Sequence, residues 1–180
     1  MPWKNGGGVT TEIAVFPEGA GLDDFEWRLS MATVATDGPF SLFAGIDRTL
    51  AVLDGEGIVL SVEGMADATL TTASPPFAFA ADRSASARLM SGPIADLNIM
   101  TRRGVWKHHV ERLALQGTTD LAGGGDAAVL FCASGQVAIA NGKEQATLLP
   151  EDAAIVDASQ IELAADTPAV LYLVGLTCTG

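Results

Sequence analysis

Short apolar runs, broken by glycine, proline, aspartate and asparagine, are the feature that most constrains this chain. Nowhere does the 180-residue sequence sustain a hydrophobic period of about 3.6 residues with helix caps. The regular turn signals instead predict an all-β fold, a sandwich or barrel, with one helical turn at most, at Leu42–Gly45. The expected strands span residues 10–16, 26–33, 49–54, 57–62, 87–89, 96–100, 105–113, 127–133, 136–140, 145–148, 153–156 and 169–176.

The sequence also contains an internal repeat of one segment. Residues 53–64 are similar to residues 131–142, with Gly57 matched to Gly135 and Gly64 matched to Gly142. Each copy combines a strand, a glycine turn, a strand and a turn, so we expect two similar β lobes in one chain. A chance likeness between two glycine-containing hairpins is the alternative.

A polar, glycine-rich stretch lies between the two copies, at residues 117–126, and is expected to be a loop or short linker. It places the lobe boundary nearby. We therefore expect a first lobe at residues 1–113 and a second at residues 114–180, although barrels of this kind often share strands between halves.

The composition predicts an extensive core and argues against several partners. Apolar residues make up 48% of the chain, charged residues 18%, and the net charge is −12. An average field of that sign repels nucleic acid and anionic membranes. The N-terminus has no basic segment followed by an apolar run, and no run of about 18 apolar residues occurs, so we expect neither export nor membrane spanning. The two cysteines are expected to be small buried hydrophobes. These features predict a cytoplasmic protein.

Positive charge is confined to one part of the chain. Nine of the ten basic residues lie within the first 112 positions, and Lys143 alone follows them. Any anion-binding site is therefore expected in the first half.

The densest candidate motif is at the start, where Trp3, Lys4 and Asn5 precede Gly6, Gly7 and Gly8. Glycine runs cost backbone entropy, but they permit close approach of a ligand to backbone N–H groups. Lys4 and Asn5 would add charge and orientation. The alternative is a flexible terminal turn with Trp3 plugging one barrel end. The motif is not a phosphate-binding P-loop, because it lacks the preceding strand and the final Lys-Ser/Thr.

A second candidate is the turn-rich passage 37–48, which presents Ser41 and Arg48 between strands. Arg28 alternates with Trp27 and Leu29 along a predicted strand, so it points away from the face that they occupy, toward solvent or a pocket.

Metal binding and nucleophilic catalysis find little support. His108 and His109 are adjacent, so they project to opposite faces of a strand, and His109 with Glu111 would supply only two ligands. No serine lies in a Gly-x-Ser-x-Gly motif, and neither cysteine has a histidine partner recognisable from spacing. We expect no metal and no other cofactor.

Several motifs together resemble the HutD/Ves family. They occur along the whole chain and are densest in residues 2–48, and members of the family carry several more residues before the first motif, so a shortened N-terminus is one expectation. The matching blocks are residues 2–10 (PWKNGGGVT), 25–30 (FEWRLS), 37–41 (DGPFS), 45–48 (GIDR), 92–93 (GP), 96–100 (DLNIM) and 102–104 (RRG).

The resemblance implies a cupin-type (RmlC-like) double-stranded β-barrel with two lobes in one chain, a bicupin, without the histidine-rich metal motifs of cupin enzymes. The family is associated with bacterial histidine utilisation, where a member is similar to a regulator that binds formylglutamate. Other members are named for stress induction.

The first functional hypothesis is a metal-independent protein that binds a small dicarboxylate such as N-formylglutamate. Basic side chains would face the carboxylates, polar ones would add hydrogen bonds, and Trp3, Trp27 and Phe40 would form an apolar wall. A homodimer formed through apolar surfaces is compatible with it. The candidate binding residues are Trp3, Lys4, Asn5, Gly6, Gly7, Thr10, Arg28, Ser41 and Arg48.

The second hypothesis is a metal-independent enzyme acting on a related amide or acid. Asp37, Asp47 or Asp82 would serve as general acid or base beside an arginine. The sequence favours binding over catalysis, because it supplies no recognisable nucleophile, metal site or spaced catalytic pair, and we assign no catalytic residue.

Overall fold

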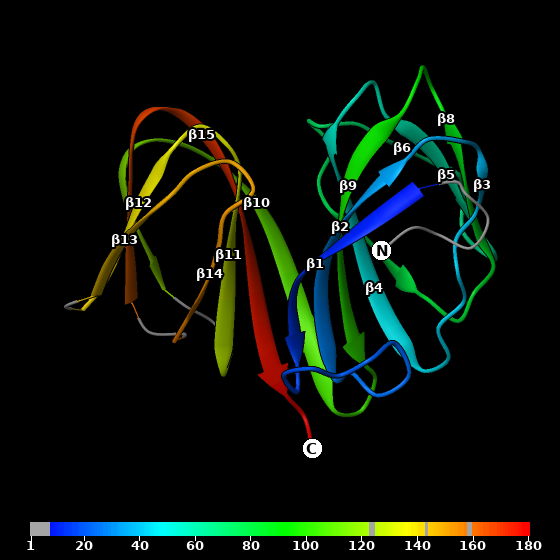
Figure 1. Cartoon of the computed structure of the whole chain (residues 1–180), viewed down its shortest axis with the longest axis horizontal. Helices are drawn as coiled ribbons and strands as arrows, with labels where there is room; N and C mark the ends of the chain where they lie inside the picture. The colour runs from blue at the N-terminus through cyan, green and yellow to red at the C-terminus, as the bar shows by residue number, and fades with distance from the viewer. Residues whose placement is uncertain (1–7, 123–124, 143, 158–159) are drawn as a thin grey trace. The chain divides into compact units, whose positions relative to one another are not determined.

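The computed structural model describes residues 8–122, 125–142, 144–157 and 160–180 (Figure 1). Within these residues the chain forms fifteen strands and no helix, which confirms the predicted all-β class. Residues 42–45 form only a turn and its approach. In the same part of the chain, no helix is long and apolar enough to cross a membrane.

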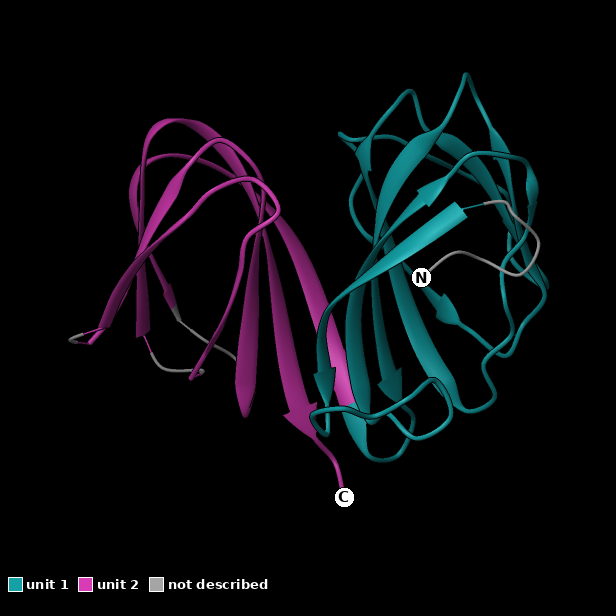
Figure 2. Ribbon diagram, in the orientation of Figure 1, with its two compact units in different colours: residues 1–106 teal, residues 107–180 magenta. Residues whose placement is uncertain are grey.

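Two compact units make up the chain, residues 1–106 and residues 107–180 (Figure 2). The expected boundary after residue 113 falls inside β10 (Trp106–Ala122), a strand of 17 residues. The loop expected at residues 117–126 is wrong over its first part, because β10 continues through it. Leu113, Leu115 and Leu121 pack on the core of the second unit, so a strand period of two extends through this polar stretch.

The first unit contains two antiparallel sheets with an apolar core between them. The core includes Leu50 and Val52 from one sheet and Ile58 and Leu60 from the other. One sheet has the order β1 (Gly8–Phe16), β2 (Trp27–Val34), β9 (Ile94–Arg102), β4 (Ile46–Asp54) and β7 (Phe77–Ala80). The other has the order β3 (Gly38–Pro39), β8 (Ala85–Leu89), β5 (Ile58–Val62) and β6 (Ala68–Leu70).

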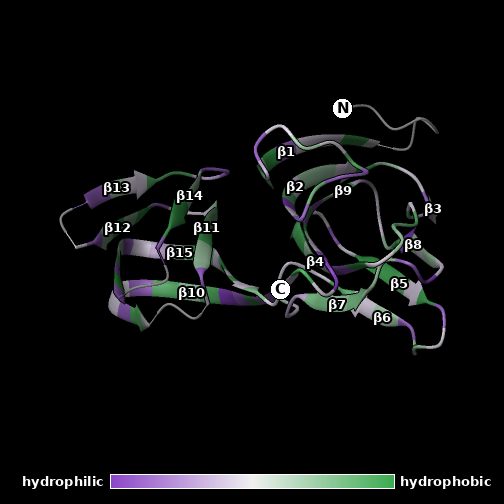
Figure 3. Ribbon diagram, turned by 90° about the horizontal axis from the view of Figure 1, so that it is seen from below, coloured by the Kyte–Doolittle hydropathy of each residue, from purple (hydrophilic) through white to green (hydrophobic). Residues whose placement is uncertain are grey.

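The second unit is a six-stranded sheet folded around its own core, which the hydropathy colouring of Figure 3 shows as green strand segments. Five strands follow the order β13 (Glu144–Leu148), β12 (Val137–Asn141), β15 (Gln160–Cys178), β11 (Ala127–Ser134) and β14 (Ala153–Val156), and β10 also pairs with β15. Leu130, Cys132 and Leu171 are fully buried in this core. Burial of Cys132 is as expected, whereas Cys178 is exposed.

The two units repeat one pattern of strand pairing. In the first unit β4 pairs with β9 and β7, and β5 pairs with β8 and β6. In the second, β11 pairs with β15 and β14, and β12 pairs with β15 and β13. The long strand β15 thus takes the place of β8 and β9 together. The internal resemblance of the sequence therefore corresponds to a repeated topology.

The register aligns the two units residue by residue. Both central strands have an irregularity near their ends, between Val52 and Asp54 in β4 and between Cys132 and Ser134 in β11. The next residue in each copy is a glycine with positive φ, Gly55 at 91° and Gly135 at 79°. The structural equivalent of Gly135 is therefore Gly55, and the predicted match with Gly57 is wrong, because the turn of the first unit contains an additional residue.

Candidate functional site

A cluster of polar and charged side chains lies on the inner face of the larger sheet of the first unit. Its five central members are at most 5% exposed: Arg28, Ser30, Arg48, Asp96 and Asn98. They alternate along β2, β4 and β9 with residues of the opposite face. They share their face with Leu50 and Val52 of the core, so we call them the lumen cluster.

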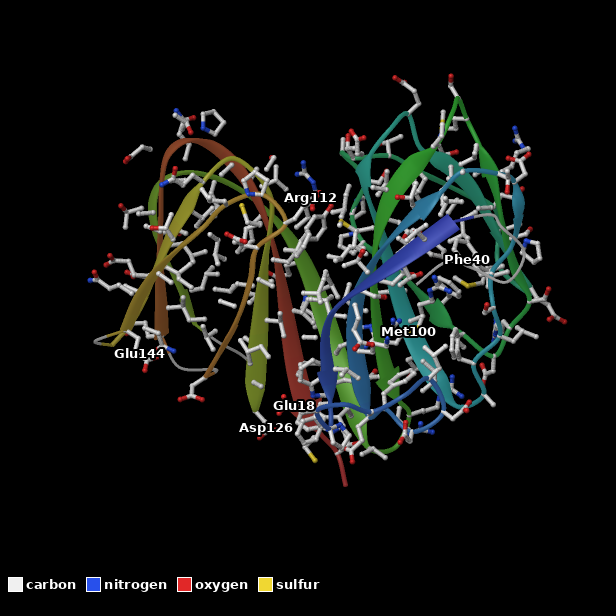
Figure 4. All side chains as sticks on the ribbon, in the orientation of Figure 1. Glu18, Phe40, Met100, Arg112, Asp126 and Glu144 are labelled. Atoms are coloured by element: carbon white, nitrogen blue, oxygen red, sulfur yellow. The ribbon has the colours of Figure 1, made fainter. Side chains whose placement is uncertain are left out.

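The strand register arranges the lumen cluster in three rows across β2, β9 and β4. The first row is Arg28, Met100 and Arg48, the second is Ser30, Asn98 and Leu50, and the third is Ala32, Asp96 and Val52. The two arginines are therefore two strands apart, about 10 Å between backbones. Figure 4 labels Met100, which lies between them, and Phe40.

Arg48 is held by an amide and two aromatic rings. Its Nε donates to Asn98 Oδ1 at 2.8 Å, and Nη2 donates to the same oxygen. Its guanidinium carbon lies 4.5 Å from the ring centroid of Phe40 and 5.7 Å from that of Phe79. Burial lowers the pKa of Arg48 to about 10, against the attraction of Asp96. The group is still a cation at neutral pH.

Asp96 is the buried acid of the lumen cluster. Asn98 Nδ2 donates to its Oδ1 at 2.5 Å, so one amide connects the carboxyl group to Arg48. Among the residues that the structure describes, no hydrogen bond reaches the buried Asp96 Oδ2. Burial raises the pKa of Asp96 to about 6, while Arg48, Asn98 and a backbone hydrogen bond at Ala32 act to lower it.

Arg28 is paired with a more exposed side chain than Arg48 is. Its Nε donates to Glu12 Oε2 at 2.8 Å and its Nη1 donates to Ser30 Oγ at 3.1 Å. The Glu12 side chain is 45% exposed, whereas Arg28 is 5% exposed. Within residues 8–122 no hydrogen bond engages Arg28 Nη2 or Arg48 Nη1. Each guanidinium therefore has an N–H edge that could receive a ligand oxygen.

The structure brings together some of the predicted binding residues. Arg28 and Arg48 share the lumen face, and Thr10 lies on it too, opposite Ala32 in the register. Ser41 is exposed in the connection after Phe40 and has no hydrogen bond to the lumen cluster among the described residues. The remaining predicted residues, Trp3, Lys4, Asn5, Gly6 and Gly7, lie outside the described residues.

Of the aromatic residues expected to form an apolar wall, Phe40 lies beside Arg48, whereas Trp27 does not lie on the same face as the arginines. Trp27 alternates with Arg28 and so lies on the opposite face of β2, where it stacks on Phe16 with ring centroids 6.0 Å apart. Phe79, which the sequence analysis did not consider, contributes the second ring beside Arg48.

Sequence reasoning assigned no role to Asp96 and Asn98, although they lie in the DLNIM block. The signal was present: they are two polar residues, two positions apart, in the otherwise apolar run from Ile94 to Met100. That spacing puts both on one face of a strand. An acid and an amide on a buried face require polar partners there, and the partner is Arg48.

The three carboxylates proposed as general acids or bases have other roles. Asp47 and Asp82 both bind Arg103, at 2.8 Å and 3.0 Å, in an exposed ion-pair group. The hydrogen bond from Arg103 lowers the pKa of Asp82. Asp37 Oδ1 accepts a hydrogen bond from the backbone N–H of Leu89 at 2.8 Å. Asp47 and Asp82 are thus paired with Arg103 at the surface, and Asp37 ties the turn before β3 to the end of β8.

The histidine region does not form a cation site in the described part of the chain. His109 Nε2 lies 3.1 Å from Glu111 Oε1, so the two side chains share a face as the spacing predicted, and both are exposed. No group of three or more His, Cys, Asp or Glu residues is placed to hold a metal ion among the described residues.

Comparisons with known proteins relate the sequence to one family. The family model described as HutD matches residues 1–173. An uncharacterized 21.2 kDa protein in the hutC 3′ region of Pseudomonas putida is 38% identical over 139 residues, 77% of this chain and 71% of that protein. Protein Ves of Citrobacter koseri is 42% identical over 135 residues, 74% of this chain and 67% of that protein.

Solved structures show the same family relationship and also identify the fold of this chain. A conserved protein of unknown function from Pseudomonas aeruginosa PAO1 matches with a TM-score of 0.91 and 35% identity, covering 98% of this chain and 93% of that one. HutD from Pseudomonas fluorescens SBW25, in a formate condition, matches with a TM-score of 0.83 and 33% identity, covering 100% and 94%. A cupin 2 conserved barrel domain protein from Leptotrichia buccalis matches with a TM-score of 0.61 and 12% identity, covering 95% and 88%. The predicted cupin-type fold is confirmed.

Proposed function

The chain belongs to the HutD family, and we propose that its first unit binds a small anionic metabolite, a dicarboxylate such as N-formylglutamate, without a metal. The observation that carries the proposal is the pair of buried arginines, Arg28 and Arg48, on one inner face, each with an N–H edge that the described residues leave unused. Burial of two cations is costly unless anions or hydrogen bonds compensate it. A ligand carboxylate would supply that compensation.

Glu12 supports an exchange mechanism for ligand entry. An ion pair with a half-exposed carboxylate contributes little to stability, because water and salt screen it. A ligand carboxylate could therefore replace Glu12 at Arg28 with little loss. Arg48 and its rings would remain in place as the fixed part of the site.

The beginning of the chain would complete the site. Lys4 and Asn5, with the backbone N–H groups of Gly6 and Gly7, lie immediately before β1, whose Thr10 is on the lumen face. Trp3 would supply an apolar cover. Through such binding the protein would act as a regulator in histidine utilisation, responding to the level of a pathway intermediate.

Calorimetric titration of the full chain with N-formyl-L-glutamate tests the proposal. We expect saturable binding, a loss of affinity of about tenfold or more for Arg48→Met and for Arg28→Met, and no change for Arg88→Ala. Arg88 is the matched control, because it belongs to the same unit but is exposed on β8. Equal heats for all four proteins would exclude the lumen arginines from the site. Circular dichroism of each variant separates a lost site from a lost fold.

A second candidate is metal-independent hydrolysis of the same kind of ligand. It is favoured by one observation, a buried carboxyl group with a pKa of about 6 near an arginine, the arrangement expected for a general acid or base. Water would add to the formyl carbonyl, the C–N bond would break, and formate and glutamate would leave. Proton NMR of N-formyl-L-glutamate with the purified protein would detect formate, and an unchanged spectrum over hours would leave binding alone.

A further inference from the structure

One buried polar atom of the first unit has no hydrogen-bond partner among the described residues. Asp96 is 0% exposed, and its Oδ2 is the one buried side-chain oxygen or nitrogen without a hydrogen bond among the described residues. An unsatisfied buried polar atom costs roughly 1–3 kcal/mol, and more when it is charged. Such an atom in a folded protein requires an explanation.

The surroundings of Asp96 fix which oxygen is held and which is left. Asn98 Nδ2 binds Oδ1, and Asn98 is fixed in turn by Arg48. Oδ2 is thereby turned away from the amide. Its neighbours in the same row are Ala32 and Val52, which have no polar side-chain atoms, and Ala32 is small. These two side chains therefore offer Oδ2 no hydrogen-bond donor, and the backbone hydrogen bond at Ala32 is the contribution of this row to the carboxyl group.

The second unit shows that the fold does not need this carboxyl group. The residue equivalent to Asp96 is Leu171, because Val52 pairs with Asp96 as Cys132 pairs with Leu171. Leu171 is fully buried in an apolar core. The same strand position is therefore stable with an apolar residue, and a structural requirement for an acid at this point is not the explanation.

We propose that Asp96 Oδ2 accepts a hydrogen bond from the ligand, so that the ligand carries an N–H or O–H donor beside the carboxylate that the arginines bind. This rests on the proposed anion binding in the first unit. It selects N-acylamino or hydroxy acids over plain dicarboxylates and over oxo acids. The three groups act together: the arginines recognise charge, Asn98 fixes the geometry, and Asp96 tests for the donor.

Burial and charge support an acceptor in this role. Above its pKa of about 6, Asp96 is ionised and can only accept. A ligand with a carbonyl oxygen at the same place would bring two acceptors together and leave both unpaired. Sites built to hydrogen-bond one polar group discriminate strongly against an analogue that lacks it.

Matched five-carbon diacids provide the test, by calorimetric titration at pH 7.5. L-2-Hydroxyglutarate, 2-oxoglutarate and glutarate have the same two carboxylates and differ in a donor, an acceptor or neither at C2. We expect the wild type to bind 2-hydroxyglutarate about tenfold or more tightly than either other acid. N-Formyl-L-glutamate, which has an N–H at the same carbon, should bind like the donor ligand.

The variant Asp96→Asn should abolish or reverse this preference. Its amide oxygen would keep the bond from Asn98, which places the NH₂ group, a donor, where Oδ2 was. We expect affinity for 2-hydroxyglutarate to fall about tenfold and affinity for 2-oxoglutarate to stay equal or rise. Arg28→Met, which leaves Arg48, Asn98 and Asp96 in place, should instead weaken the binding of all of these ligands alike. Thermal melting identifies any variant that is not folded, and Asp96→Leu, with the residue type found at position 171, serves as a second variant in which only the donor advantage is lost.

The outcomes separate the two proposals. If the wild type binds the three diacids equally, or if Asp96→Asn and Asp96→Leu leave their ratio unchanged, the role of Asp96 is overturned and the anion site stands. If no diacid and no N-formyl-L-glutamate binds the wild type, the anion site is overturned and the role of Asp96 with it.

Discussion

At the positions where the first unit places Arg48, Asp96 and Asn98, the second unit places Ala128, Leu171 and Leu173. The equivalence follows from the register, since Arg48 pairs with Met100 and Phe79 as Ala128 pairs with Gly175 and Val156. One pairing pattern thus encloses a charged interior in the first unit and an apolar one in the second. The comparison separates what the fold requires from what the site requires.

An apolar interior is the less costly way to fill such a barrel. Buried ion pairs and amides lose hydration that their mutual contacts only partly return, and apolar replacements of similar volume are often as stable or more so. The second unit has that solution in Leu130, Cys132 and Leu171. The buried charged residues of the first unit therefore lower its stability, and we propose that they are retained because they bind the ligand.

The largest expected effect comes from removing one half of the charged arrangement. Arg48→Met keeps the volume but leaves Asp96 buried without its nearest cation, and we expect a loss of about 3–5 kcal/mol in the free energy of unfolding. Adding Asp96→Leu removes the stranded acid, as in the second unit. The double variant should recover most of the loss. All three tryptophans lie in residues 1–106, so tryptophan fluorescence in a urea titration reports on the first unit.

The control for this experiment is the single variant Asp96→Leu, which leaves Arg48 with Asn98 and Phe40. If the two single losses add in the double variant, Arg48 and Asp96 do not interact, and the charged interior is not one unit.

The pH dependence of stability is the next largest difference. Burial raises the pKa of Asp96 from its ordinary value of 3.8 to about 6, so folding favours the protonated acid. The stability that this provides is fully present below about pH 4 and is lost as the pH rises to about 6, up to about 3 kcal/mol. Asp96→Asn lacks this titration while other carboxylates titrate in both proteins. Between pH 4 and 6 the wild type should therefore lose stability relative to Asp96→Asn, by up to about 3 kcal/mol. A difference in unfolding free energy that stays constant over this range would contradict the expectation.

The strand pairing is common to the two units, so substitutions at equivalent turn positions should destabilise both units equally. Substitutions in the charged interior should affect only the first unit. Gly55 and Gly135 both have positive φ, and an added Cβ would meet backbone atoms of Pro93 and Ile94 in one unit and of Pro168 and Ala169 in the other. We expect Gly55→Ala and Gly135→Ala each to destabilise its own unit by about 2 kcal/mol. Hydrogen exchange, followed separately in peptides of each unit, measures both. A clear inequality would show that the two turns are not equivalent.

Much of the fold was predictable, because it depends on local patterns. Alternating apolar residues and turn glycines indicated β strands in a sandwich or barrel, and the family resemblance indicated the cupin type. Strand alternation gave Arg28 a face opposite to Trp27. The equivalence of Gly135 with Gly55 was not predictable by matching glycines. It depends on which residues pair across β4 and β9, and a one-residue difference in a turn changes that match without changing the composition.

The site was predictable only in part, for a similar reason. Arg28 and Arg48 were found because cations are rare in this acidic chain. Asp96 and Asn98 were given no role, because their importance comes from a contact between β4 and β9, strands distant in sequence. The difference between Ser41, which is exposed, and its neighbour Phe40, which packs on Arg48, depends on the path of the connection before β4, and the residue types in it do not reveal that path.

The smallest expected effect concerns the aromatic rings that contact Arg48. The second unit has no such contact, because Ala128 takes the place of Arg48 there. Phe40 is 9% exposed and lies closest to the guanidinium. Phe40→Leu keeps an apolar side chain but removes the ring, and we expect a loss of about 1 kcal/mol, near the usual value of a partly desolvated cation–π contact. Urea titration followed by tryptophan fluorescence measures it. The same substitution in the Arg48→Met background should cost less, because the cation is gone. If Phe40→Leu costs the same in both backgrounds, Phe40 is only a core residue, and the charged interior of the first unit ends at Asn98.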